Sequence, residues 1–271
     1  MKLNTIPVRY SRVTSVYFIT MRCRFGRSWA TSIFTIAAIA AQQRTGPETA
    51  TEERLYAALA GLQKVVTDKR MPEYLRSTAE NSVGWLGVRL LTKEQWKGSN
   101  ATLQQRRWEA SAEREPKNTA APAAGPPAPI PAAYVASLEV DLKMLQAALG
   151  KNDSKQSEER TLAAVQDLKI KSDDCLKFGR ARMVDVEVST VKAGQLVKDA
   201  QVYYKYVAVG DLPTARLPMD SADNPAHQQL SPGLYDFQAE AAVDGNLVVS
   251  AAMRAAVGGV PVVRLAIRIA H

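Results

Sequence analysis

Histidine and cysteine are scarce in this chain of 271 residues, which contains two of each. Two cysteines cannot build a disulfide-dense scaffold or a four-cysteine zinc site. His227 and His271 alone nearly exclude a metal centre with several imidazole ligands. The chain also lacks a glycine-rich phosphate loop, a nucleophile elbow and a zinc-binding helix motif. We therefore expect no catalytic, cofactor-binding or metal-binding residues, and we interpret the protein as a non-enzyme.

Acidic residues are missing from the beginning of the chain, where Glu48 is the first carboxylate. Residues 1–41 carry six basic side chains, namely Lys2, Arg9, Arg12, Arg22, Arg24 and Arg27. The formal net charge of the chain is +8, and subtracting these six leaves +2 for residues 42–271. Most of the basic excess therefore belongs to the leader, and the remaining chain gives no electrostatic reason to expect a nucleic-acid partner.

The leader has the parts of a secretory signal. A positive stretch at 21–27 precedes an uncharged run at 28–43, in which residues 38–40, Ala-Ile-Ala, fit the small-x-small pattern of signal peptidase. Met21 begins a complete signal by itself, so we interpret residues 1–20 as an upstream mis-start. The uncharged run is shorter than the ~20 residues of a spanning helix. We expect export with cleavage, and the alternatives are an uncleaved membrane anchor and a buried cytosolic helix.

The first region after the leader, residues 48–115, is predicted to be helical. Hydrophobic residues make up 46% of the chain, enough for a folded core, and here they recur at helical spacing. The predicted helices cover 51–68, 72–90 and 92–115, the last of them interrupted near Gly98. Thr49 and Glu52 have the spacing of a capping box, as do Thr92 and Gln95.

A Pro/Ala linker at 116–132 follows, and its prolines predict an extended, semi-rigid spacer. The next region, 133–179, is predicted to be a helical hairpin with helices at 133–150 and 157–177. The short loop between these two amphipathic helices favours an antiparallel arrangement.

From Met183 the hydrophobic period changes from that of a helix to that of a strand. Val184, Val186, Val188 and Val191 are separated by polar residues, which is typical of strands with one buried face. Turn signals recur at Ala193-Gly194, Pro232-Gly233, Asp244-Gly245 and Gly258-Gly259. Six to seven short strands with frequent turns predict a β-sandwich over 183–271. The fold class is therefore α+β, with a helical region and a helical hairpin followed by a C-terminal all-β sandwich.

Two segments of the sandwich carry a family resemblance. The first runs from Val186-Glu187-Val188 through Gly194 to Ala200–Tyr204, and the second is Leu-Ser-Pro-Gly-Leu-Tyr-Asp-Phe-Gln-Ala at 230–239. Together they resemble a prealbumin-like (transthyretin-like), carboxypeptidase-regulatory-like domain of exported bacterial proteins, over about a third of the chain. The resemblance implies a non-catalytic accessory domain. It also implies a fold motif, in which a leucine fills the core, Pro-Gly turns the chain and alternate residues point inward: Leu230, Pro232, Gly233, Tyr235, Phe237 and Ala239.

Two features invite a chemical role but also have plainer interpretations. Ser189 and Lys192 fit a Ser-x-x-Lys motif, yet on an alternating strand their side chains do not meet, so we interpret the match as chance. Cys175 lies seven residues after Leu168 and therefore on the same apolar helix face. A buried thiol is the first interpretation, and an intermolecular disulfide in an oxidising compartment is the alternative.

Polar residues of the β-region give equally weak signals. His227 has no partner motif and is expected at the surface. Asp220, Asp223 and Asn224 could bind a cation, but their spacing matches no EF-hand loop, so a solvated loop is the first interpretation.

The helical half contains three tryptophans, for which we expect core packing, with a ligand-stacking surface as the alternative: Trp85, Trp96 and Trp108. Arg106 and Arg107 next to Trp108 resemble a nucleic-acid patch. Because the acidic Glu109 follows directly, we do not expect this pair to bind nucleic acid.

The favoured function is that of an exported, non-enzymatic envelope protein whose sandwich serves binding or structural support. We expect its partner to be an envelope protein or a polysaccharide, contacted through the loop 210–229 and the Pro232–Gly233 end. Membrane contact is expected only through an uncleaved N-terminal segment. The alternative is an envelope enzyme, or an enzyme accessory subunit, with its site in the helical region. Such a site would need acid–base carboxylates, and the candidates are Glu52, Glu53, Glu73 and Glu80.

Overall fold

The computed structural model describes residues 47–96, 101–113, 129–150, 154–197, 199–207, 217–219, 224–243 and 245–269. The expected leader at 1–41 and residues 116–128 of the Pro/Ala linker lie outside these ranges, as do Asp220, Asp223 and His271. The described elements belong to one compact unit, Thr45–His271. None of the described helices is both long enough and apolar enough to cross a bilayer.

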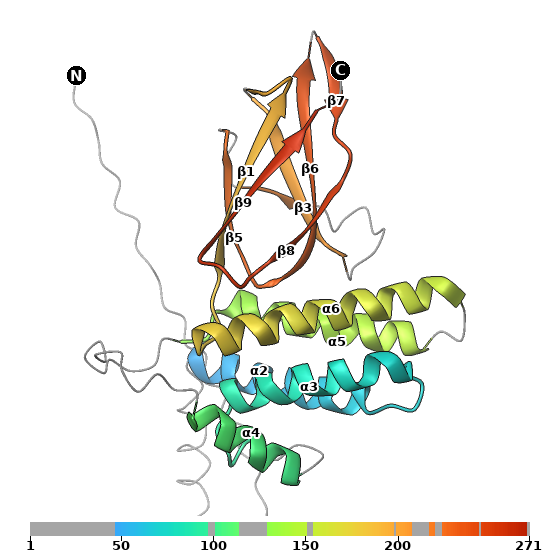
Figure 1. Ribbon diagram of the computed structural model, residues 1–271, viewed down its shortest axis with the longest axis vertical. Helices are drawn as coiled ribbons and strands as arrows, with labels where there is room; N and C mark the ends of the chain where they lie inside the picture. The colour runs from blue at the N-terminus through green and yellow to red at the C-terminus, as the bar shows by residue number, and fades with distance from the viewer. Residues whose placement is uncertain are drawn as a thin grey trace, which may run out of the picture. The chain divides into compact units, whose positions relative to one another are not determined.

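The α+β class is confirmed, with helices in the first half of the described chain and strands in the second (Figure 1). The described helices are α2 (Pro47–Val66), α3 (Glu73–Leu90), α4 (Ala101–Glu113), α5 (Ala132–Gly150) and α6 (Ser154–Phe178). Helix α2 begins at Pro47, whose ring suits the first turn of a helix. The predicted capping box at Thr49 and Glu52 is therefore wrong, because both residues already lie inside the helix.

The segment between α3 and α4 also differs from the prediction. Thr92 and Gln95 do form a capping box, since Gln95 Oε1 accepts a hydrogen bond from Thr92 N at 2.9 Å and Thr92 Oγ1 accepts one from Gln95 N at 3.3 Å. These bonds enclose only a turn, and the helix begins at Ala101. Trp96 follows this turn and packs into the helical core against Gly87. A Cβ atom on Gly87 would overlap the indole ring.

The helices stack in pairs next to the sandwich (Figure 1). Helices α5 and α6 lie beside the strands, α2 packs against α5, α3 packs against α6, and α4 covers α3. The predicted apolar faces of α2, α3 and α5 meet in one core, which includes Leu55, Leu59, Leu62, Val66, Leu75, Ala79, Val83, Leu86, Tyr134, Leu138, Leu145 and Leu149. Leu162 of α6 is an exception, because the prediction placed it on the apolar face and the structure leaves it 37% exposed.

The strands form a sandwich of two sheets, each built around one long central strand. In the first sheet, β1 (Val184–Lys192) pairs in parallel with β9 (Val262–Arg268) and in antiparallel orientation with β5 (Ala226–Leu230) and β2 (Gln195–Leu196). In the second sheet, β6 (Gly233–Val243) pairs with β3 (Gln201–Tyr206), β7 (Asn246–Val249) and β8 (Met253–Val257), and β4 (Leu217–Pro218) pairs with β3. Valines of β1 and aromatic residues of β6 meet in the core between the sheets.

The alternation of β1 holds to its end. Thr190 enters the core together with the preceding valines, whereas Val191 is half-buried. The prediction placed Val191 on the inner face, which is wrong because a strand keeps a strict period of two. Ala193 and Gly194 follow with φ angles of 49° and 82°, as a two-residue hairpin turn between β1 and β2 requires.

Candidate functional site

The six residues of the predicted fold motif lie around the link between β5 and β6. Four of them are buried in the sandwich core, namely Leu230, Tyr235, Phe237 and Ala239. Pro232 and Gly233 are also buried, but against helix α6. Gly233 lies so close to this helix that a Cβ atom on it would overlap the Asp167 carboxylate. The Pro232–Gly233 end is therefore covered by the protein's own helix. The expectation that this end contacts a partner is wrong, because α6 occupies it.

The expected contact loop at 210–229 is a strand over its last residues. Positions 226–229 belong to β5 and pair with β1. Asn224 donates hydrogen bonds to Thr190 O at 2.7 Å and Val197 O at 2.8 Å, and accepts one from Thr190 N at 3.1 Å. Asn224 is thus a bridge between backbone segments rather than a cation ligand. Among the described residues, no group of three or more His, Cys, Asp or Glu side chains could hold a metal ion.

Cys175 lies in the helical core, as predicted for a buried thiol. Burial is the largest effect on this group and raises the pKa of the thiol to about 12. A neutral, enclosed thiol cannot reach another chain, which disfavours the intermolecular disulfide. His227 is exposed on β5, and Ser189 and Lys192 lie on opposite faces of β1.

The three tryptophans all pack against the helical core. Trp96 is buried there, whereas Trp85 and Trp108 are half-buried. The two neighbouring arginines diverge, because Arg106 is exposed and Arg107 turns inward. They therefore do not form one basic surface of the kind that binds nucleic acid.

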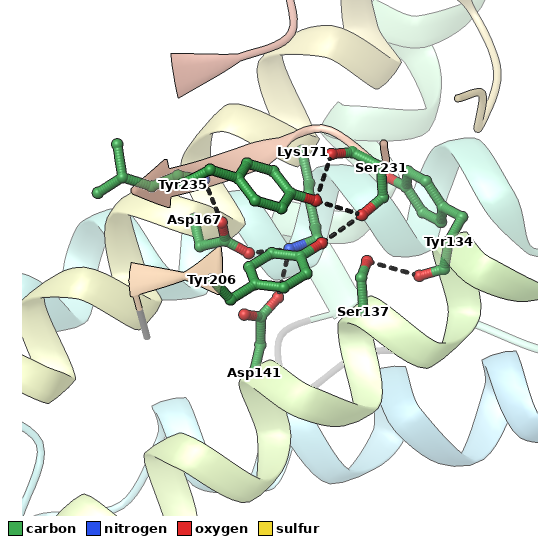
Figure 2. Close-up of polar contacts among 9 residues, drawn as sticks. Tyr134, Ser137, Asp141, Asp167, Lys171, Tyr206, Ser231 and Tyr235 are labelled. Atoms are coloured by element: carbon green, nitrogen blue, oxygen red, sulfur yellow. Dashed lines mark hydrogen bonds and ion pairs between the residues drawn. The ribbon is translucent and has the colours of Figure 1, made fainter. Parts of the chain in front are cut away.

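A buried ionic network lies where α5 and α6 meet the sandwich (Figure 2). Lys171 of α6 is fully buried and donates to Asp141 Oδ2 of α5 at 2.8 Å. Lys171 also pairs with Asp167, one turn earlier in α6. The network therefore places one ammonium group between two carboxylates, away from solvent.

Side chains on the same face of α6 bind backbone amides of the sandwich. Asp167 Oδ1 accepts a hydrogen bond from Leu234 N at 2.5 Å, where β6 begins. Asp174 Oδ1 accepts one from Gly259 N at 2.7 Å, in the link between β8 and β9. Asp167, Lys171 and Asp174 follow each other at spacings of four and three residues, and we call them the charged row of α6. The two carboxylates of the charged row thus bind the sandwich at the beginning of β6 and in the link between β8 and β9.

Tyrosines close the network on the sandwich side (Figure 2). The ring of Tyr206 lies 5.1 Å from Lys171 Nζ, within the range of a cation–π interaction, and its centroid lies 4.3 Å from that of Tyr235. Tyr235 donates a hydrogen bond to Ser231 O at 2.9 Å, and the Ser231 hydroxyl also bonds Tyr206. The charged and hydroxyl groups at this junction contact one another and are closed off from solvent, as expected of a structural joint.

Burial shifts the protonation of this network. It raises the pKa of Asp141 to about 6, against the opposing attraction of Lys171. Burial also lowers the pKa of Lys171, which Asp141 in turn opposes. Asp141 Oδ1 has no hydrogen-bond partner among the described residues. Both shifts favour the uncharged forms, because removal from water penalises the charged form of each group more than their mutual attraction stabilises it.

An open pocket of about 560 Å³ lies in the helical half, between α3, α4 and α6. We call it the α3–α4–α6 pocket. Its lining includes Glu80, Trp85, Arg107 and Ser172. Of the four carboxylates proposed for a helical site, only Glu80 lines this pocket, whereas Glu52, Glu53 and Glu73 are exposed on the helix surface. Most of the residues gathered there are polar and they differ in charge, and the volume lies within the range of small-molecule sites.

Sequence patterns did not reveal either site. Asp167, Lys171 and Asp174 have the spacing of a solvated helix face, and nothing local indicates that strands cover them. Arg107 looked like half of an exposed basic pair. The one available signal was the Gly84-x-x-Gly87 spacing inside α3, because glycine is costly in a helix and is retained where another side chain must approach closely.

We predict that Lys171→Met strongly destabilises the fold, by about 3–5 kcal/mol, because it leaves two buried carboxylates without a cation. The matched control is Lys169→Met, since Lys169 is exposed and pairs with the exposed Asp173 at 2.5 Å. This control should cost no more than about 1 kcal/mol. Urea unfolding of both variants measures the difference. Equal losses would show that Lys171 is solvated.

The raised pKa of Asp141 predicts a pH dependence of stability. The folded protein keeps the Asp141 proton up to about pH 6, whereas an unfolded aspartate loses it near pH 4. The folded state binds more protons in this window, so Asp141 makes the free energy of unfolding fall as the pH rises from 4 to 6. Asp141→Asn should remove this fall, and Asp173→Asn, at an exposed carboxylate, should keep it. Identical profiles for the wild type and Asp141→Asn in urea unfolding at several pH values would contradict the prediction.

Comparisons of the chain with protein-family models, with curated proteins and with solved structures give no match. The resemblance of the sandwich to a prealbumin-like domain accordingly stays a prediction. Function is therefore inferred from the residues, contacts and pockets of this chain.

Proposed function

We propose that this protein is exported to the cell envelope and acts there without catalysis, its sandwich serving binding or structural support. We also propose that the sandwich is of the prealbumin-like, carboxypeptidase-regulatory-like type. The observation that carries the proposal is the charged row of α6, which fixes the sandwich to the helices through β6 and the β8–β9 link.

The bonding of the polar residues at this joint supports a structural role. Lys171, Asp167 and Asp174 each bond a partner inside the protein. A catalytic group must reach its substrate, and this network is closed to solvent. A joint of this kind suits a protein that holds one surface rigidly in position.

A candidate contact surface lies at the end of the sandwich away from the helices, on the β6–β7 hairpin (Figure 1). Leu247 is 71% exposed and Val249 is 46% exposed, and both lie on the same face of β7. Exposed apolar side chains that lie together on a strand are typical of surfaces that contact another protein, because the contact removes them from water. We therefore propose that an envelope protein, rather than a polysaccharide, is the partner at this hairpin.

The alternative is an envelope enzyme or an enzyme accessory subunit with its site in the helical half. The observation that favours it is the α3–α4–α6 pocket, which includes Glu80 as a carboxylate. Turnover of envelope substrates by the wild type, abolished by Glu80→Gln, would favour this alternative over the non-enzymatic function.

Export predicts that the mature protein begins near Ala41 and lies in the envelope or the medium. Mass spectrometry of the native protein gives its N-terminus, and fractionation with a carbonate wash separates free from anchored protein. Recovery of residues 1–20 on the mature protein, or of the protein in the cytosol, would contradict export with cleavage.

Contact through the β6–β7 hairpin predicts that a partner is cross-linked in the intact envelope and lost when β7 becomes polar. We expect Leu247→Ser with Val249→Ser to abolish the cross-linked product while leaving the circular dichroism unchanged, because both side chains are exposed. Leu162→Ser is the matched control, since Leu162 is an exposed leucine of the helical half. Loss of the product in the control, or its persistence in the β7 variant, would exclude this surface.

A further inference from the structure

Arg107 is a buried charge at the edge of the α3–α4–α6 pocket. Its side chain is only 6% exposed, and its guanidinium lies where a Cβ atom on Gly84 would overlap it. It donates one hydrogen bond, to Asn81 Oδ1 at 3.2 Å, and forms no ion pair with any described residue. Buried arginines normally pair with a carboxylate, because an isolated charge is costly to remove from water. Arg107 therefore has no carboxylate at ion-pair distance among the described residues.

Ser172 is a second polar residue in the lining of the same pocket. It is 3% exposed and makes no hydrogen bond with any described residue. Ser172 comes from α6 and Arg107 from α4, so two different helices bring them to one hollow. The Ser172 hydroxyl is therefore available to bond a molecule held in this pocket.

The acidic groups of the pocket are not equivalent. Asp173 is neutralised by Lys169 at 2.5 Å. Glu80 forms no hydrogen bond or ion pair with a described residue, and it lies near enough to raise the pKa of Arg107 against the larger lowering by burial. The pocket therefore presents one positive and one negative group on neighbouring helices, and neither forms an ion pair at contact distance with a described residue.

We propose that the α3–α4–α6 pocket binds a small zwitterion that carries an ammonium and a carboxylate group, either a free amino acid or a short peptide. The carboxylate of the ligand pairs with Arg107, whose planar fork matches two oxygen atoms, and the ammonium pairs with Glu80. Ser172 bonds the carboxylate, and Trp85 and Leu176 provide an apolar wall for the side chain of the ligand.

The charges of the pocket disfavour other ligands. A phosphate with two negative charges would meet one unpaired cation and an unpaired Glu80, which repels it. A simple carboxylate would leave Glu80 without a partner, and a neutral sugar would leave Arg107 unpaired. The volume of about 560 Å³ suits a small molecule. The site lies in the helical half, so it does not depend on the role proposed for the sandwich.

Isothermal titration calorimetry of the purified full chain tests this proposal with defined probes. The probes are the common L-amino acids, dialanine, acetate, methylamine and inorganic phosphate. We expect at least one amino acid or the dipeptide to bind, and acetate, methylamine and phosphate to bind at least about tenfold more weakly. Preference between amino acid and dipeptide identifies which of the two sources fits the pocket.

Variants locate the binding within the pocket. We expect Arg107→Lys and Glu80→Gln each to weaken the binding about tenfold or more, because each loses a charged contact. The controls are Arg106→Gln and Glu73→Gln, whose side chains are exposed on the same two helices and should leave the affinity unchanged. If Arg107→Lys unfolds the protein, the affinity of the Glu80→Gln variant still tests the proposal, because Glu80 is only half-buried. The proposal is overturned if no zwitterion binds, if acetate binds as tightly, or if Glu80→Gln has no effect.

Discussion

The pairing of Lys171 with Asp141 and Asp167 is the interaction on which the joint between helices and sandwich depends. Burying ions costs several kcal/mol for each, and this cost is offset only when every member keeps its partners. Asp167 neutralises Lys171 with one oxygen and accepts the Leu234 amide with the other. One carboxylate therefore binds a buried cation and an amide at the beginning of β6, so neither contact is independent of the other.

Helix α6 serves both candidate sites with two different faces. The charged row faces the sandwich, while Lys169, Ser172, Asp173 and Leu176 face the α3–α4–α6 pocket. Because one end of the sandwich is covered by α6, the exposed apolar residues of its opposite end, on β7, are the better candidate for contact with a partner. The fold thus separates the buried charged joint, the α3–α4–α6 pocket and the exposed apolar edge at β7.

Apolar periodicity predicted most of the secondary structure, because both periods follow from local backbone geometry. Leu55, Leu59 and Leu62 are buried as expected, and Ala193-Gly194 turns the chain where expected. The same rules missed β5, whose polar sequence Ala-His-Gln-Gln-Leu resembles a loop. Its pairing comes from β1, and hydrogen bonds of the backbone do not depend on which side chains the strand carries.

The sequence by itself determined the α+β class, the positions of the helices and long strands, and the burial of Cys175. Only the tertiary structure decided that Asp167, Lys171 and Asp174 are buried and that Arg107 faces a pocket. Apolar residues are buried wherever a partner surface exists, so their pattern alone is informative. A charged residue is buried only if specific partners compensate it, and besides their nearby cations Asp167 and Asp174 bind backbone amides of the sandwich that lie 67 and 85 residues away. No local pattern can contain that information.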